Sequence, residues 1–317
     1  MKESILITGS AGFIGSHLSE QLLSRGYRII GIDNFDTFYD PAIKKKNIAR
    51  LLEHPSYSFR EGDIRDSHFL DDLFATKIDK IIHLAARAGV RPSIQQPLLY
   101  EDVNIRGTLN LLEKARDGSV RQFIFASSSS VYGGNRKIPF SESDRVDSPV
   151  SPYAATKKSG ELFCFYYHHL YKISVTCLRF FTVYGPRQRP EMAISSFARA
   201  IIDEKELSVY GDGTIKRDFT YIDDIIDGVV RSLECPFGFE IFNLGESKNH
   251  EVGYVIELLS KLIGKSAKIR YLPPEAGDMS VTLADIQKAR NLLGYNPKVS
   301  LEKGLANFVS FLMQKSS

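Results

Sequence analysis

Residues 4–15 read Ser4-Ile5-Leu6-Ile7-Thr8-Gly9-Ser10-Ala11-Gly12-Phe13-Ile14-Gly15. A short apolar run predicts a buried strand, and the spacing of Ile14, Leu18 and Leu22 predicts a helix that begins among the glycines. At such a turn a dinucleotide's diphosphate can meet a helix N-terminus, because the backbone approaches closely only where no Cβ intervenes. The stretch therefore predicts a dinucleotide-binding site formed by Gly9, Gly12, Phe13, Ile14 and Gly15.

The following sequence alternates between strand-like and helical patterns. Further strands are predicted at residues 28–33, 58–62, 80–84, 122–127 and 174–180, with amphipathic stretches between them. This alternation predicts an α/β fold with a Rossmann-type, doubly wound parallel sheet.

After about residue 180 the alternation breaks at a Pro- and Arg-rich loop, and helices are predicted at 252–263 and 301–313. We therefore predict a dinucleotide-binding domain over 1–180 with a return segment at about 221–245. A smaller α/β substrate domain is predicted over 181–220 and 246–317.

The composition excludes several classes of protein. The 317 residues are 43% hydrophobic and 25% charged, as in a globular protein, and a net charge of +3 does not indicate a nucleic-acid-binding surface. Lys44 to Lys46 are interpreted as a solvated helix face. Neither a run of 18 apolar residues nor a signal-peptide pattern is present, which predicts a cytoplasmic protein without membrane segments.

Metal and disulfide chemistry have no support in the sequence. The seven histidines show no metal-ligand spacing, so no metal is expected. Cys164, Cys177 and Cys235 form no Cys-x-x-Cys pair and are predicted to be buried thiols.

Two aspartates follow predicted strands on the cofactor side. Asp33 stands 18 residues after Gly15, where its carboxylate can accept hydrogen bonds from both ribose hydroxyls of an adenosine. Since no Arg or Lys occurs among residues 34–36 to neutralise a 2′-phosphate, NAD is predicted rather than NADP. Asp63, followed by Ile64, either borders the adenine ring or caps a helix.

A second set of residues has catalytic character. Tyr153 and Lys157 stand one helical turn apart on one face, although about one such spacing is expected by chance in this chain. An ordinary surface pair is the alternative. The run from Ser127 to Ser130 favours catalysis, because it ends the fifth predicted strand at the edge where doubly wound sheets bind ligands.

The sequence resembles the extended short-chain dehydrogenase/reductase family, in its nucleotide-sugar epimerase and dehydratase branch, over nearly the whole chain. Besides the glycine motif, the matching segments are 83–86, 103–108, 128–133, 153–157 and 217–224. Within the branch, residues 88–91, 153–158 and 180–192 are similar to UDP-glucuronate 4-epimerases.

The resemblance implies roles for these residues. NAD would also contact Asn34, Leu84, Ala85, Ala86, Asn104, Tyr153 and Lys157. Tyr153 would act as the base on the sugar 4-hydroxyl, with its pKa lowered by Lys157 and by oxidised nicotinamide, and Ser128 would hydrogen-bond the same oxygen. Dehydratases and UDP-glucuronate decarboxylases usually carry an acid where this chain has Ser129 and Ser130.

On the substrate side, the resemblance places Arg217 on the diphosphate and Asp278 on the ribose or diphosphate. Thr182 stands where many relatives have Asn. Arg91 and Arg189 are candidates to bind a sugar carboxylate, although arginines of such a loop can equally form a solvated edge. Arg87 and Glu275 depart from the common pattern, and Arg87 has no explanation from the sequence.

The implied activity is 4-epimerisation of UDP-glucuronate to UDP-galacturonate through a 4-keto sugar. The alternatives are epimerisation of UDP-galactose or UDP-N-acetylglucosamine, a UDP-glucuronate decarboxylase, and a non-catalytic NAD-binding regulator. Helix 153–171 carries large apolar residues on more than one face, which predicts a partner surface. The resemblance suggests a homodimer in which this helix and one near 100–115 form a four-helix bundle.

Overall fold

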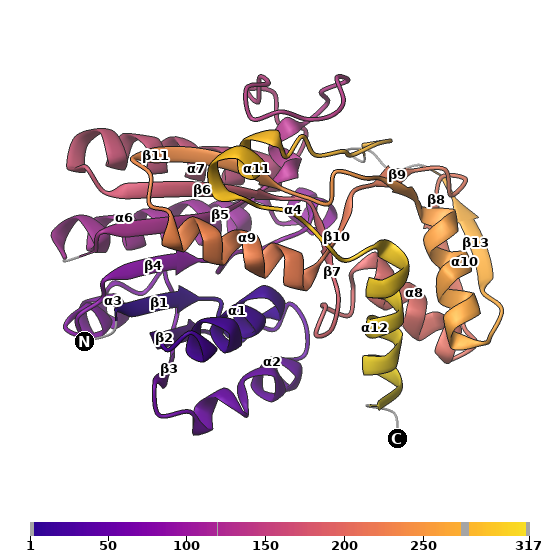
Figure 1. Cartoon of the computed structure of the whole chain (residues 1–317), viewed down its shortest axis with the longest axis horizontal. Coiled ribbons are helices and arrows are strands. Elements are labelled where there is room, and N and C mark those ends of the chain that lie inside the picture. The colour runs from indigo at the N-terminus through magenta and orange to yellow at the C-terminus, as the bar shows by residue number, and fades with distance from the viewer. Residues whose placement is uncertain (1–2, 119, 274–278, 315–317) are drawn as a thin grey trace.

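The computed structural model describes residues 3–118, 120–273 and 279–314. Its centre is a seven-stranded sheet with the strand order β3-β2-β1-β4-β5-β6-β11 (Figure 1). All of its neighbouring strands run parallel. The strands are β1 (Ser4–Thr8), β2 (Arg28–Asp33), β3 (Tyr57–Glu61), β4 (Lys80–His83), β5 (Gln122–Ser128), β6 (Ser174–Phe180) and β11 (Phe239–Leu244). The predicted doubly wound sheet is confirmed, and the six predicted strands form within one residue of their expected bounds.

Helices cover both faces of this sheet. One face carries α1 (Phe13–Ser24), α9 (Ile222–Glu234) and α11 (Gln287–Leu293), and α2 (Pro41–Ile48) packs beside α1. The other carries α3 (Ser67–Phe74), α6 (Gly107–Asp117) and α7 (Pro152–Tyr171). Alternate residues of β1 enter two separate apolar clusters, Ile5 and Ile7 on one side and Leu6 on the other.

Shorter elements connect the strands and form the rim of the sheet. They are η1 (Leu51–Glu53), α4 (Val90–Gln95), α5 (Pro97–Glu101), the π-helical turn η2 (Asp102–Arg106) and the 3₁₀ turn η3 (Ser129–Tyr132). The η2 turn joins α5 directly to α6, and η3 follows β5 directly.

The chain leaves the sheet after β6 and later returns to it. Outside the sheet lie β7 (Thr182–Tyr184), α8 (Ala193–Ile202), β8 (Glu206–Tyr210), β9 (Lys216–Arg217), β10 (Phe219–Tyr221), β12 (His250–Glu251), α10 (Val252–Ile263), β13 (Lys268–Leu272) and α12 (Leu301–Gln314). Helix α9 and strand β11 bring the chain back to pair with β6, within the segment predicted to return.

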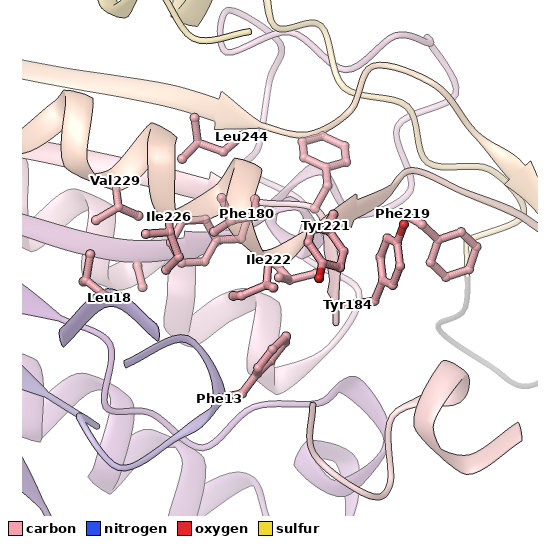
Figure 2. Packing of buried hydrophobic residues seen from close by; sticks show 14 of the residues in the cluster. Phe13, Leu18, Phe180, Tyr184, Phe219, Tyr221, Ile222, Ile226, Val229 and Leu244 are labelled. Atoms are coloured by element: carbon pink, nitrogen blue, oxygen red, sulfur yellow. The ribbon is translucent and has the colours of Figure 1, made fainter. Parts of the chain in front are cut away.

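The segments outside the sheet gather on the right in Figure 1, where β8 pairs with β13 and α8 packs against α10. Their core continues into the core of the sheet: one apolar cluster includes Leu18 of α1, Leu244 of β11 and Phe308 of α12. Figure 2 shows the part of this cluster where Phe180, Ile222 and neighbouring residues meet between the strands and α9. This packing fixes the loops after β6 relative to the carboxyl edge of the sheet.

Two expectations about surface and burial need correction. Cys164 and Cys177 are buried as predicted, but Cys235 is exposed, because it follows the last turn of α9 at the surface. Lys44 is buried and only Lys45 and Lys46 are exposed, because α2 turns its Lys44 side toward the sheet. Within the residues that the structure describes, none of the helices has the length and apolar character needed to span a membrane.

Candidate active site

A cavity of about 490 Å³ lies at the carboxyl edge of the sheet. This edge is where doubly wound folds bind ligands. The structure brings most of the predicted site residues to its wall: Gly9, Gly12, Phe13, Ile14, Gly15, Asp33, Asn34, Asp63, Ile64, Leu84, Ala85, Ala86, Ser128, Ser129, Ser130, Tyr153, Lys157, Thr182 and Arg189.

The glycine turn between β1 and α1 has space for backbone only. Gly9 has a φ of +68°, and a Cβ there would lie 2.9 Å from the backbone nitrogen of Ala85. A Cβ on Gly15 would lie 2.2 Å from the carbonyl oxygen of Gly9. The turn is therefore pressed against the end of β4 while the first turn of α1 opens to the cavity, an arrangement suited to a diphosphate.

Asp33 ends β2 at the cavity and has a cationic neighbour that the sequence did not reveal. One oxygen of its carboxylate accepts a hydrogen bond from the Phe35 backbone N–H at 2.9 Å and lies 3.5 Å from the Lys44 ammonium. Burial raises the pKa of Asp33, while Lys44 and the Phe35 N–H oppose the shift. The interpretation of Lys44 as solvated was wrong, and the charge argument against a 2′-phosphate has to include this lysine.

Asp63 also lies on the cavity wall, where several hydrogen bonds hold its carboxylate. Its carboxylate accepts hydrogen bonds from the side chains of Arg65 and Asn34. Burial alone would raise the pKa of Asp63, but these hydrogen bonds outweigh it and lower the pKa to about 2. Helix α3 is capped by Asp66, so Asp63 faces the cavity without being that helix's cap.

Asn104 is buried just behind the cavity wall rather than in it. Its side-chain oxygen accepts from the Arg87 N–H at 2.8 Å, and its side-chain nitrogen donates to the Arg87 carbonyl at 2.9 Å and to Thr156 Oγ1 at 3.0 Å. Thr156 in turn donates to the Tyr153 carbonyl. Asn104 thus joins the segment after β4 to the start of α7.

Helix α7 presents Tyr153 and Lys157 to the cavity beside the end of β5. Ser151 caps the helix and Pro152 occupies its first position, so Tyr153 lies in the first turn. The Lys157 ammonium donates to the Ala126 carbonyl at 2.7 Å and lies 6.0 Å from the centre of the Tyr153 ring. Ser128 caps the η3 turn by accepting from the Ser130 N–H at 3.1 Å.

The pKa values of this set are governed first by burial. Burial raises the pKa of Tyr153, against the lowering effects of a hydrogen bond with Ser128 and of the Arg189 charge. Burial lowers the pKa of Lys157 to about 8. The sequence predicted a lowered tyrosine pKa, and the protein groups alone do not produce it.

A buried ion pair supports the segment that carries Ser128. Arg179 of β6 donates to both carboxylate oxygens of Glu161 of α7, at 2.8 and 2.9 Å, and to the Tyr132 hydroxyl at 3.0 Å. Ser127 donates to Glu161 at 2.6 Å. The pair therefore fixes residues on both sides of Ser128 to Ser130.

The wall opposite the glycine turn carries hydroxyl and guanidinium donors. Ser129 and Ser130 come from η3, Thr182 from the start of β7, and Arg189 from the following loop. The Thr182 N–H donates to the Asp218 carbonyl, which fixes β7 beside β10. The Arg189 guanidinium lies 3.1 Å from the Glu191 carboxylate and is one-fifth exposed.

Two predicted substrate residues, Arg91 and Arg217, are not part of the cavity wall, and a third falls outside the described part of the chain. The Arg91 guanidinium lies over the Tyr210 ring, 3.7 Å from its centre. Arg217 lies in β9, opposite His250 of β12. Asp278, like Glu275, lies outside the described residues.

Sequence reasoning missed several residues of the wall, notably Asp36, Phe38, Lys44 and Arg87. The position of Arg87 directly after Ala86 could have indicated that it belongs to the wall. Residues that come just after a parallel strand lie at the edge of the sheet where ligands bind. Lys44 gave no such signal, because only the packing of α2 against α1 brings it back to Asp33. Among the described residues, no group of three His, Cys, Asp or Glu side chains is arranged to hold a metal ion.

The fold and the cavity together define an extended short-chain dehydrogenase/reductase. The parallel sheet supplies a glycine turn without room for a Cβ, Asp33 at the end of β2, and a Ser, Tyr and Lys set beside them. These residues fit a dinucleotide cofactor.

Comparison with known proteins gives the family. A family model described as GDP-mannose 4,6 dehydratase matches residues 6–308, and the chain belongs to this family. A UDP-glucuronate 4-epimerase of Thermodesulfobacterium geofontis is 47% identical over 308 residues, which are 96% of this chain and 95% of the relative.

Solved structures agree with this assignment. UDP-glucuronic acid 4-epimerase from Bacillus cereus, in complex with UDP-glucuronic acid and NAD, matches with a TM-score of 0.92 and 41% identity over 98% of this chain and 99% of that one. UDP-glucose 4-epimerase from Thermotoga maritima, with UDP-glucose, matches with a TM-score of 0.91 and 33% identity over 99% and 100%. The family resemblance inferred from the sequence is confirmed.

Proposed function

We propose that the protein is an isomerase that interconverts UDP-glucuronate and UDP-galacturonate by NAD-dependent inversion at C4. The observation that carries this proposal is the placement of Ser129, Ser130, Thr182 and Arg189 around the same cavity as Tyr153. These donors suit a carboxylate next to the reacting carbon. The relatives from T. geofontis and B. cereus support the same substrate.

The cofactor proposed is NAD, held by the glycine turn, Asp33 and Asp63, with Lys157 near the reacting end. The bound cofactor would supply the hydride acceptor for oxidation at C4 and the hydride donor for reduction of the opposite face of the sugar.

Tyr153 takes the proton of the 4-hydroxyl as that carbon is oxidised and returns it as the carbon is reduced. Ser128 hydrogen-bonds the same oxygen. Because burial raises the pKa of Tyr153, the proton transfer requires nearby positive charge, which Arg189 supplies in part. Lys157, anchored on the Ala126 carbonyl, keeps its ammonium beside the tyrosine.

Elimination is disfavoured although the family model is described as a dehydratase. The relatives that remove water or CO2 usually carry an acid just after the active-site hydroxyl, and this chain has Ser129 and Ser130 there. A serine hydroxyl neither protonates a leaving hydroxyl efficiently nor repels a carboxylate. The residues at these two positions therefore support epimerisation.

A uronate adds a hazard that the cavity has to control. Oxidation at C4 makes a β-keto acid, which loses CO2 when the bond between C5 and the carboxylate aligns with the carbonyl π system. Fixed donors that hold the carboxylate out of this alignment protect the intermediate. We assign this task to Ser129, Ser130, Thr182 and Arg189.

The nucleotide half is proposed to bind along the part of the chain formed by 181–220 and 246–317, with 1–180 and about 221–245 as the cofactor domain. Arg217 is proposed to bind the diphosphate, and Asp278 to bind the ribose or the diphosphate. Arg91 is less suited than Arg189 to the sugar carboxylate, because it stacks on Tyr210 outside the cavity wall.

The protein is also proposed to be a homodimer. Leu162, Phe165 and Leu170 of α7 are each at least half exposed, and Leu98 of the adjacent α5 is 81% exposed. A second copy that covers these faces would complete a four-helix bundle. A monomeric mass by light scattering at micromolar concentration would contradict the proposed dimer. The location in the cytoplasm stays a prediction.

The test of the reaction is a panel of UDP-sugars followed by NMR. We expect UDP-glucuronate to give UDP-galacturonate without net NADH, and Thr182→Ala or Arg189→Ala to slow this turnover or release a UDP-pentose. If the protein converts UDP-galactose or UDP-N-acetylglucosamine but leaves UDP-glucuronate unchanged, the proposed uronate substrate is wrong. Denatured protein that releases no dinucleotide would overturn the mechanism.

A further inference from the structure

Arg87, which has no explanation from the sequence, is held between the cavity and the loop after β2. Its backbone is fixed on both sides by Asn104. Its guanidinium donates to the Asp36 carboxylate at 3.0 Å, and the two side chains are 16% and 30% exposed. Within the described part of the chain, the buried Nε of Arg87 has no hydrogen-bond partner. Arg87 also lines the cavity, so its cationic guanidinium is placed to attract an anion bound there.

The strand order places this ion pair across the glycine turn. Asp36 follows β2 and Arg87 follows β4, and these two strands flank β1 in the sheet. The turn from Gly9 to Gly15 follows β1 and therefore lies between them. An ion pair that joins the two flanking loops bridges the mouth of the diphosphate site.

Phe38 extends this bridge toward the substrate side. The Arg87 guanidinium lies 5.1 Å and the Arg189 guanidinium 5.5 Å from the centre of the Phe38 ring. Both distances are within the range of a cation–π contact. Three loops, after β2, β4 and β7, thus meet at one aromatic side chain on the cavity wall.

We propose that Asp36, Phe38 and Arg87 form a clasp that retains the dinucleotide cofactor between catalytic cycles. The clasp rests on the proposed function for the identity of the cofactor. A 4-epimerase needs such retention, since the hydride removed in the first half of the cycle is required in the second. The positive charge of Arg87 attracts a cofactor phosphate, while its contact with Asp36 holds the loop after β2 in place.

The test measures release of dinucleotide from the purified holoprotein. The variants are Arg87→Met, Asp36→Asn, their combination, and Phe38→Leu, which keeps the apolar volume but loses the aromatic ring. Arg60→Gln is the matched control, because it breaks an ion pair with Asp72 on the exposed side of β3. Holoprotein is mixed with excess labelled NAD, and the unlabelled dinucleotide that remains bound is measured over time.

We expect Arg87→Met to release dinucleotide at least about tenfold faster than wild type, because loss of one partner of a charge pair acts on dissociation. The combined variant should release it little faster than Arg87→Met alone. The proposed clasp would be overturned if Arg87→Met released dinucleotide at a rate within twofold of wild type. An equal acceleration of release in Arg60→Gln would overturn it as well. This assay measures cofactor retention and needs no catalytic turnover. Wild-type protein that holds NAD but does not epimerise UDP-sugars would therefore overturn the proposed function, but not the proposed clasp.

Discussion

Replacement of Arg179 by Met should destabilise the whole protein through one buried carboxylate. The side chains of Arg179 and Glu161 are each 1% exposed, and Arg179 makes two hydrogen bonds to Glu161. Burial alone would raise the pKa of Glu161, but the hydrogen bonds and charge of Arg179 outweigh it and hold the pKa below the usual value. Without Arg179, the Glu161 carboxylate either stays charged without enough solvation or takes up a proton, and both outcomes cost free energy of folding.

Breaking a buried pair by removal of one partner costs about 3–5 kcal/mol. Lys158 lies 3.3 Å from the second Glu161 oxygen and compensates part of the lost charge, so the lower end applies, about 3 kcal/mol. With an unfolding entropy of about 2.1 cal/mol/K per residue, a loss of about 3 kcal/mol lowers the Tm of the 317-residue chain by roughly 4.5 °C.

The assay is a double-mutant cycle by calorimetry with Arg179→Met, Glu161→Leu and both. The double variant should lose less stability than Arg179→Met alone, because it carries no orphaned carboxylate. A single variant within about 1 kcal/mol of wild type, or strictly additive losses, would refute the claim that this pair acts as a buried unit.

The remaining predictions concern the cofactor and the base. Tyr153→Phe should slow C4 oxidation by at least about 10²-fold while dinucleotide stays bound, and near-normal turnover by NMR would point to another base. Asp33→Ala should raise the affinity for NADP relative to NAD at least about tenfold, since it removes a repelling carboxylate and frees Lys44; an unchanged ratio by calorimetry would contradict this. Because burial lowers the pKa of Lys157 from 10.5 to about 8, the unfolded chain binds more protons in that interval and stability rises with pH there. In Lys157→Met, the free energy of unfolding from denaturant titrations should differ less between pH 8 and pH 10 than it does in wild type. An unchanged difference would contradict this prediction.

The parallel sheet and the glycine turn could be predicted because local sequence determines them. The inner strands β1, β4 and β5 each contain a run of buried apolar residues, at 5–7, 81–82 and 123–126, and each ends at a polar residue. The position of Ser128 and Asp33 at the binding edge follows from the same pattern, since parallel strands all end on one side.

The rest of the site depends on distances that the sequence does not encode locally. Lys44 returns to Asp33 only because α2 packs against α1, and a run of three lysines looks the same whether one side is covered or not. Arg91 and Arg189 both follow recognisable motifs, yet Tyr210 of β8 engages one while the other reaches the cavity wall. Burial likewise raises the pKa of Tyr153 in the protein without cofactor, an effect that the sequence pattern does not reveal.

Helix α7 joins the candidate active site to the surface that we propose for assembly. Tyr153, Lys157 and Glu161 recur every four residues and therefore lie on the face toward the sheet, where they meet the cavity, the Ala126 carbonyl and Arg179. Leu162, Phe165 and Leu170 lie on the side that the described chain leaves exposed. A partner packed on that side would hold the axis of the helix, and the Tyr153 hydroxyl keeps its place only if that axis does. Tyr153 therefore depends on both faces of α7, the buried ion pair within the subunit and the apolar face proposed to meet its second copy.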